Sequence, residues 1–144
     1  MIEEDTVKLL RECDAGVKMG VSSINDVLDS VEAEELRRRL VSCRTAHEEL
    51  GREIRGRLDR FQDRGKDPSP IAQGMSWVKS NVMLAMKNAD STIADLMTDG
   101  CNMGVKSLNR YLNQYAAAEE YSKDVAKRLI GLEQKLTADV RDYL

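Results

Sequence analysis

The chain has 144 residues, 33% of them charged and 4% aromatic, with a formal net charge of −3. This length fits one domain, and the scarcity of proline together with apolar residues at helical spacing predicts an all-α fold. Both signs of charge are interspersed, and no apolar run approaches the roughly 18 residues that cross a bilayer, so we expect neither nucleic acid nor a membrane as a partner.

The N-terminal part predicts a helical hairpin over about residues 5–62. Its first helix, about 5–31, has an apolar stripe with alternating spacings of three and four: Leu10, Cys13, Val17, Gly20, Ile24, Val27 and Val31. Its second helix, about 34–62, has a similar stripe: Leu36, Leu40, Cys43, His47, Leu50, Ile54, Leu58 and Phe61. The join between them, SVEAE, is so short that the two helices must be antiparallel neighbours.

A polar crossover is expected next, over about residues 63–90. The stretch QDRGKDPSP ends the second helix, and Ser69 followed by Pro70 has the residue types of a helix N-cap and first turn. A short helix over about 70–87 follows, with Trp77 as the side chain expected to anchor it to the bundle.

The C-terminal part predicts a second hairpin over about residues 91–144. KNADS interrupts the helical pattern near 87–91, and a long helix then runs to about Tyr115. We expect a turn at about Ala116–Ala118. The last helix carries the apolar positions Tyr121, Val125, Leu129, Leu132, Leu136, Val140 and Tyr143.

The two hairpins share a repeated phrase. Residues 16–28 read GVKMGVSSINDVL and residues 100–112 read GCNMGVKSLNRYL, and seven of the thirteen positions are identical, including two glycines, a serine and an asparagine. Two unrelated amphipathic helices usually share only their apolar positions. We therefore interpret the chain as an internal duplication of a hairpin.

The repeat places small residues on one face of each helix. Glycine inside a helix costs roughly 1 kcal/mol relative to alanine, so a compensating role is expected. We predict that these residues let the first and third long helices of the bundle cross closely, or form a subunit contact or a ligand slot. The set is Gly16, Gly20, Ser23, Gly100, Gly104 and Ser107. Met19 and Met103, in the same repeat, are expected to fill the core.

The motif MGVxS(I/L)NxxL, together with CRTAHEELGREI at 43–54, resembles uncharacterised bacterial proteins of the ferritin-like superfamily. Two hairpins joined by one long crossover also match the layout of those folds, an up-down four-helix bundle. The resemblance implies a family in which metal-binding members supply inward glutamates and Glu-x-x-His pairs from each hairpin.

The chain departs from that ligand pattern. His47 is the only histidine, Arg44 stands three residues before it, and the repeat-related position is approximately Leu132. We therefore expect no standard di-iron centre and no cofactor, and interpret His47 as a neutral, hydrogen-bonded core histidine. The weak metal candidates are His47 and Asp14. The three cysteines, in odd number and without C-x-x-C spacing, are expected to be small buried hydrophobes.

These residues predict a non-enzymatic interaction or structural module that forms a homo-oligomer. Two alternatives remain open: a protein that handles iron, another divalent metal or oxygen at a non-standard site near His47, and histidine phosphotransfer through an exposed His47. The first residues, MIEEDTVKLL, lack the basic start and apolar core of a signal peptide, so we expect a cytoplasmic protein.

Overall fold

The computed structural model describes residues 2–68 and 89–144. Within them lie four long helices, α1 (Ile2–Leu28), α2 (Glu34–Asp59), α4 (Ala89–Gln114) and α5 (Glu120–Val140), followed by a single 3-10 turn, η1 (Arg141–Tyr143). The described part of the chain contains no strand, so the predicted all-α class is confirmed. The turn expected near 116–118 is also present. The predicted short helix at 70–87 and its Trp77 lie outside the described residues.

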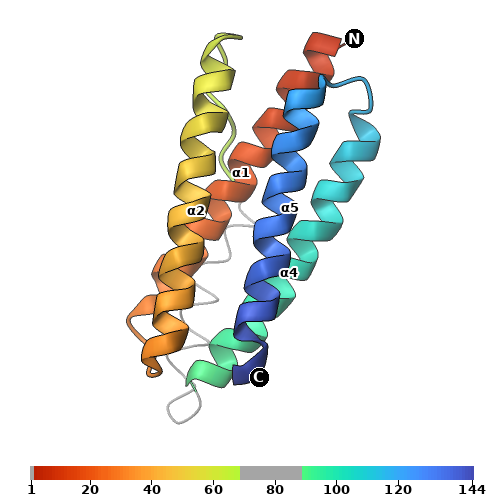
Figure 1. Ribbon diagram of the computed structural model, residues 1–144. Coiled ribbons are helices and arrows are strands. Elements are labelled where there is room, and N and C mark those ends of the chain that lie inside the picture. Colours follow the sequence, from red (N-terminus) through yellow and green to blue (C-terminus); the bar gives the residue numbers. More distant parts are fainter. Residues whose placement is uncertain (1, 69–88) are drawn as a thin grey trace.

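The helices form two antiparallel hairpins (Figure 1). α1 packs mainly against α2 and α4 mainly against α5, while α5 also contacts α1 and α2. α2 and α4 run in the same direction, so the end of α2 and the first described residues of α4 lie at opposite ends of the bundle (Figure 1).

The core consists of two apolar clusters, one toward each end of the bundle. One cluster joins the first half of α1 to the second half of α2 and to the α4–α5 turn, and it includes Leu9, Leu10, Val17, Ile54, Leu58 and Leu129. The other joins the remaining halves and includes Ile24, Val27, Leu36, Leu40, Ile93 and Leu136. Most positions of the predicted stripes are buried, because residues three and four apart share one face of a helix.

Each hairpin turn is capped by the start of the other hairpin. The carboxylate of Asp90, at the start of α4, accepts hydrogen bonds from the backbone N–H groups of Glu32 (2.8 Å) and Ala33 (2.9 Å) in the α1–α2 turn. At the opposite end, Asp5 accepts one from Ala117 (3.0 Å) and Thr6 Oγ1 accepts one from the backbone N–H of Glu119 (2.8 Å). Because N-terminal helix N–H groups lack partners within their own helix, both caps lock the two hairpins together.

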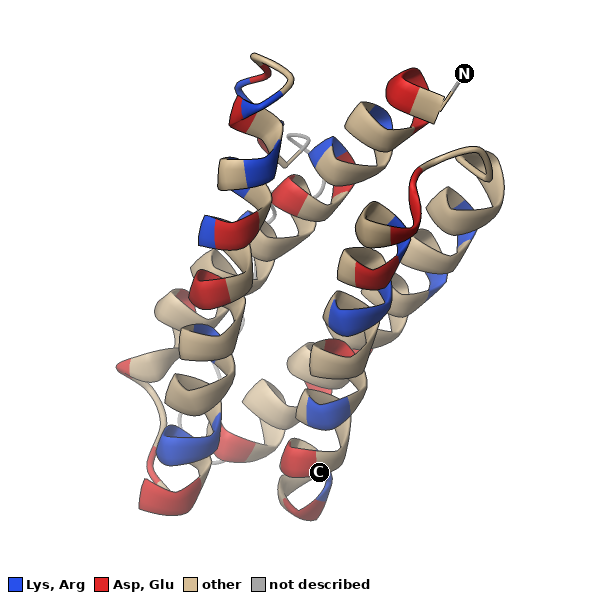
Figure 2. Ribbon diagram, turned by 45° about the horizontal axis from the view of Figure 1, so that its top comes forward, with Lys and Arg blue, Asp and Glu red and all other residues tan. Residues whose placement is uncertain are grey.

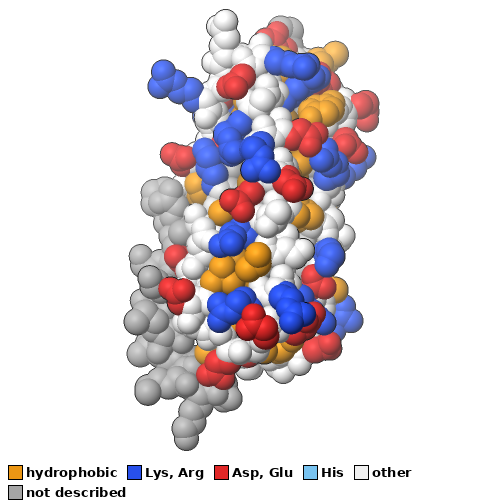
Figure 3. All heavy atoms as spheres, turned by 60° about the vertical axis from the view of Figure 1, so that its left-hand side comes forward, with side chains coloured by type: hydrophobic (Ala, Val, Ile, Leu, Met, Phe, Trp, Pro, Cys, Tyr) orange, Lys and Arg blue, Asp and Glu red, His pale blue; other side chains and the backbone are white. Residues whose placement is uncertain are grey.

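Charged side chains cover the outside of the helices. Figure 2 shows acidic and basic positions on all four long helices, scattered among uncharged ones. On the face seen in Figure 3 the two signs are interspersed, with small apolar areas between them. One predicted core residue lies on the outside of the bundle: the side chain of Met103 is 70% exposed, so its expected place in the core is wrong.

Candidate functional site

His47 lies in the middle of the bundle, at the level that separates the two apolar clusters. Its side chain is 1% exposed. It belongs to the inward stripe of α2, between the buried residues Leu40 and Leu50. A phosphorylated histidine must be reachable by a partner, so this burial argues against phosphotransfer through His47.

Both ring nitrogens of His47 face acceptors. Nδ1 is 2.8 Å from the carbonyl oxygen of Cys43 and 3.5 Å from its Sγ, and Nε2 is 3.3 Å from Oε1 of Glu133 on α5. Burial by itself lowers the pKa of His47, but the hydrogen bonds to Cys43 and Glu133 outweigh it and raise that pKa to about 10. A carbonyl oxygen and a carboxylate oxygen both require a donor, so the ring is an imidazolium at neutral pH. The expectation of a neutral histidine is wrong.

The repeated glycines lie beside this polar pair, and Gly20 makes room for the ring of His47. A Cβ built on Gly20 would lie 2.7 Å from Cδ2 and 2.8 Å from Nε2 of His47, closer than real side chains pack. At the corresponding position of the second hairpin, a Cβ on Gly104 would lie 3.5 Å from Cδ of Glu133. Each glycine therefore faces a polar side chain of its own hairpin partner, and the pair His47–Glu133 bridges the hairpins.

The two glycines differ in how tightly they are enclosed, which leads to a prediction. Gly20→Ala should lower the free energy of unfolding by about 1–2 kcal/mol, because overpacking outweighs the gain in helix propensity. Gly104→Ala, which makes only an ordinary contact, should raise it by up to about 1 kcal/mol. Urea titration of both variants checks this; equal effects of the two substitutions would contradict the assigned role of Gly20.

The predicted close crossing of the first and third long helices at these glycines is wrong. The neighbours of Gly20, Gly16 and Gly104 belong to α2, α5 and α5, and a Cβ on Gly16 would meet Leu129 of α5 at 3.2 Å. A Cβ on Gly100 would meet no described residue within 4 Å. Ser23 and Ser107, which extend the same faces, are half-buried.

Asp14 belongs to a different cluster. It is fully buried, forms an ion pair with Lys18 (2.8 Å) and accepts a hydrogen bond from the backbone N–H of Lys66 (3.0 Å). It therefore holds the segment that follows α2 against α1. The structure does not bring Asp14 and His47 into one site, and among the described residues no three His, Cys, Asp or Glu side chains are placed to hold a metal ion.

The cysteines are unpaired, and two of them are buried as predicted. Burial raises the pKa of the Cys13 thiol to about 12. Burial, followed by the charge of Glu133, also raises the pKa of Cys101. Both thiols stay protonated at neutral pH and are poor nucleophiles. Cys43 is half-buried beside His47.

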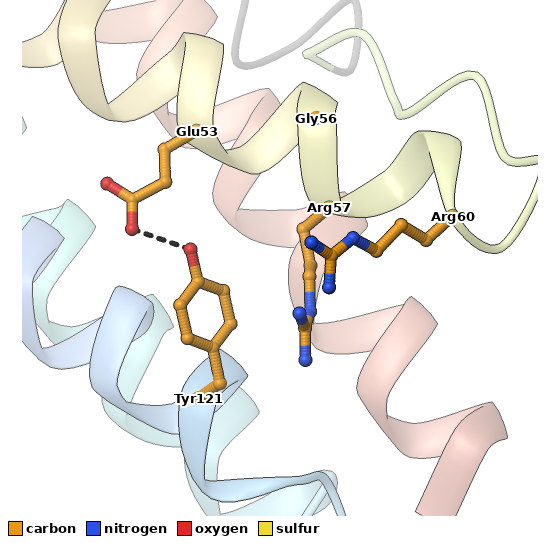
Figure 4. Close-up of a pocket in the computed structure, with 5 residues that line it drawn as sticks. All are labelled: Glu53, Gly56, Arg57, Arg60 and Tyr121. Carbon is orange, nitrogen blue, oxygen red and sulfur yellow. Dashed lines mark hydrogen bonds between the residues drawn. The ribbon is translucent and has the colours of Figure 1, made fainter.

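Two hollows of the described surface lie along the groove between α2 and α5. One is lined by Glu53, Gly56, Arg57 and Arg60 from α2 and its C-cap, and by Tyr121 from α5 (Figure 4). The other continues the groove from Glu53 and is lined by Ala46, Glu49, Leu50, Arg128, Gly131 and Leu132. We call the two hollows together the α2–α5 groove.

Most charged groups of the groove are already paired. Glu53 accepts hydrogen bonds from two nitrogens of Arg128 (2.8 Å each) and from Tyr121 Oη (2.6 Å; Figure 4). The bonds from Arg128, and then the bond from Tyr121, lower the pKa of Glu53 to about 2. Arg57 pairs with Glu119 at 2.9 Å and lies 4.5 Å over the ring of Tyr121. Arg60 and Glu49 are exposed and have no ion pair among the described residues.

Sequence reasoning missed Glu133 and the groove. Leu129, Glu133 and Leu136 follow the spacings of four and three that define an inward stripe, so the register itself pointed to Glu133. The groove carries no motif, because it arises from glycines on two helices that meet only after folding.

The chain matches no protein-family model, and no curated protein or solved structure is significantly similar to it. No helix in the described ranges is both long enough and apolar enough to span a membrane.

Proposed function

We propose that the protein is a non-enzymatic helical-bundle module of the ferritin-like type, without a standard di-iron centre, that acts by protein contact and associates with itself. The main observation behind the proposal is the burial and hydrogen bonding of His47. Nucleophilic catalysis, phosphotransfer and the metal alternative all depend on this histidine, and it is enclosed between the hairpins with both ring nitrogens hydrogen-bonded.

The ferritin-like type is supported by the arrangement of the helices and by the sequence repeat of the two hairpins. α2 ends and α4 begins at opposite ends of the bundle, as one long crossover requires (Figure 1). The reciprocal caps from Asp5 and Asp90, and the parallel roles of Gly20 and Gly104, support a duplicated hairpin. Both glycines then lie beside the pair His47–Glu133, and Gly20 makes room for the ring of His47.

Two measurements on the wild-type protein test this function. Sedimentation velocity over a wide concentration range should show mass rising above the 16.2 kDa monomer, which would be absent from a monomeric enzyme or carrier. Metal analysis after purification without a chelator should give no stoichiometric metal, and added iron or zinc should not raise the melting temperature. A bound metal, or a monomer at every concentration, would overturn the proposal.

A further inference from the structure

The outer face of α4 carries an unusual exposed apolar side chain. Met103 is 70% exposed, and the other exposed large hydrophobic side chains in the described ranges, Ile2 and Leu144, lie at the two ends of the chain. Gly100, one turn before Met103, is exposed with open space around it. Another helix can therefore approach the backbone closely at Gly100, whereas a larger side chain at this position would block it.

Charged residues flank Met103 in a definite order. Asp95 and Asp99 precede it and Lys106 follows it, and all three are exposed without an ion pair among the described residues. At 100° per residue these side chains and Met103 occupy one narrow face of α4. From its N-terminal to its C-terminal end, the outer face of α4 thus carries acidic, then apolar, then basic side chains.

The α2–α5 groove carries the complementary order. Arg60 is the unpaired cation at one end and Glu49 the unpaired anion at the other. Between them the apolar part of the floor is formed by Leu50, Gly56, Gly131 and Leu132. The same lining includes Glu53 and Arg128, which are paired with each other. A Cβ on Gly56 or on Gly131 would meet nothing within 4 Å, so the two interior glycines leave the groove open.

The charged residues of the groove and those of the outer face of α4 also have the same spacing. Glu49 and Arg60 are eleven residues apart, and so are Asp95 and Lys106. At 1.5 Å per residue each pair spans about 16 Å along its helix. An α4 helix laid antiparallel to α2 would therefore place Asp95 near Arg60, Lys106 near Glu49 and Met103 over the apolar floor.

We propose that the α2–α5 groove of one copy receives the outer face of α4 from a second copy. The inference rests on the proposed self-association and assigns it a surface. Because the two faces are different parts of the molecule, the contact is heterologous, and it builds open chains or rings in place of a closed dimer. Unpaired charges set the register, and Met103 supplies the apolar anchor.

Charge exchange tests the register. Arg60→Glu and Asp95→Arg should each lower the association constant at least tenfold in sedimentation velocity, since each places like charges opposite one another. The double variant Arg60→Glu/Asp95→Arg should recover most of the loss. Arg64→Glu, which changes an exposed arginine outside the groove, is the matched control and should associate like the wild type.

The anchor is tested by Met103→Glu, with Ile2→Glu as the exposed apolar control. Met103→Glu should leave a folded monomer with an unchanged helical circular dichroism spectrum, while Ile2→Glu should still associate. If the wild type associates but these variants behave alike, or if mass stops rising at the dimer, the groove assignment fails and the proposed self-association stands. If the wild type is monomeric throughout, both fail.

Discussion

Replacing Glu133 with glutamine should lower the free energy of unfolding at pH 7 by about 3 kcal/mol, the largest effect expected from a change that conserves shape. The substitution keeps an oxygen that can accept from Nε2 of His47 but removes the negative charge opposite a ring that is 1% exposed. Removing one partner of a buried ion pair leaves the other charge uncompensated. Urea titration followed by circular dichroism measures the loss.

The same variant should change the dependence of stability on pH. The pKa of His47 is raised from 6.5 to about 10 on folding, so the folded protein holds a proton that the unfolded chain releases in this range. The stabilisation is fully present below pH 6.5 and is lost as the pH rises through 10, by up to about 1.4 kcal/mol for each pH unit. The difference in free energy of unfolding between the wild type and Glu133→Gln should therefore shrink as the pH approaches 10.

Glu120→Gln provides the control for this pair of measurements. Glu120 is on the same helix, and its side chain is 88% exposed, so its loss should change stability by a few tenths of a kcal/mol at most. If Glu133→Gln were equally mild, or if its gap to the wild type stayed constant up to pH 10, His47 would not be an imidazolium held by Glu133.

The second large effect is expected at Gly65, in the segment after α2. Its φ is +81°, a conformation that favours glycine, and a Cβ there would overlap Oδ2 of the buried Asp14. Gly65→Ala should lower the free energy of unfolding by about 3 kcal/mol, because backbone strain adds to the loss of the hydrogen bond from Lys66 to Asp14. Thermal and urea unfolding both measure this.

Gln62→Gly is the informative counterpart. Gln62 is a non-glycine residue with a φ of +55°, so glycine relieves strain at the same turn. This variant should be no less stable than the wild type. Destabilisation by both substitutions to a similar degree would mean that general loosening of the segment, and not the contact with Asp14, explains the effect at Gly65.

At the centre of the bundle, some features could be predicted from the repeated sequence and others could not. The matched glycines and the inward position of His47 were predictable, because identical positions recur and the stripe of α2 has a regular spacing. The partner of His47 was not, because helix register within one hairpin does not say which side chain of the other hairpin lies at the same height. The prediction that the glycines join the first and third long helices was wrong for that reason.

The helices, their pairing into hairpins and most of the buried apolar positions could be predicted from the sequence, because they follow from the 3.6-residue helical period and from short turns, which are local features. The charge of His47, its separation from Asp14 and the form of the α2–α5 groove depend on how the two hairpins pack together. Each of those depends on the distance between atoms far apart in the chain. Burial and electrostatic energy change steeply over a few ångströms that no sequence pattern encodes.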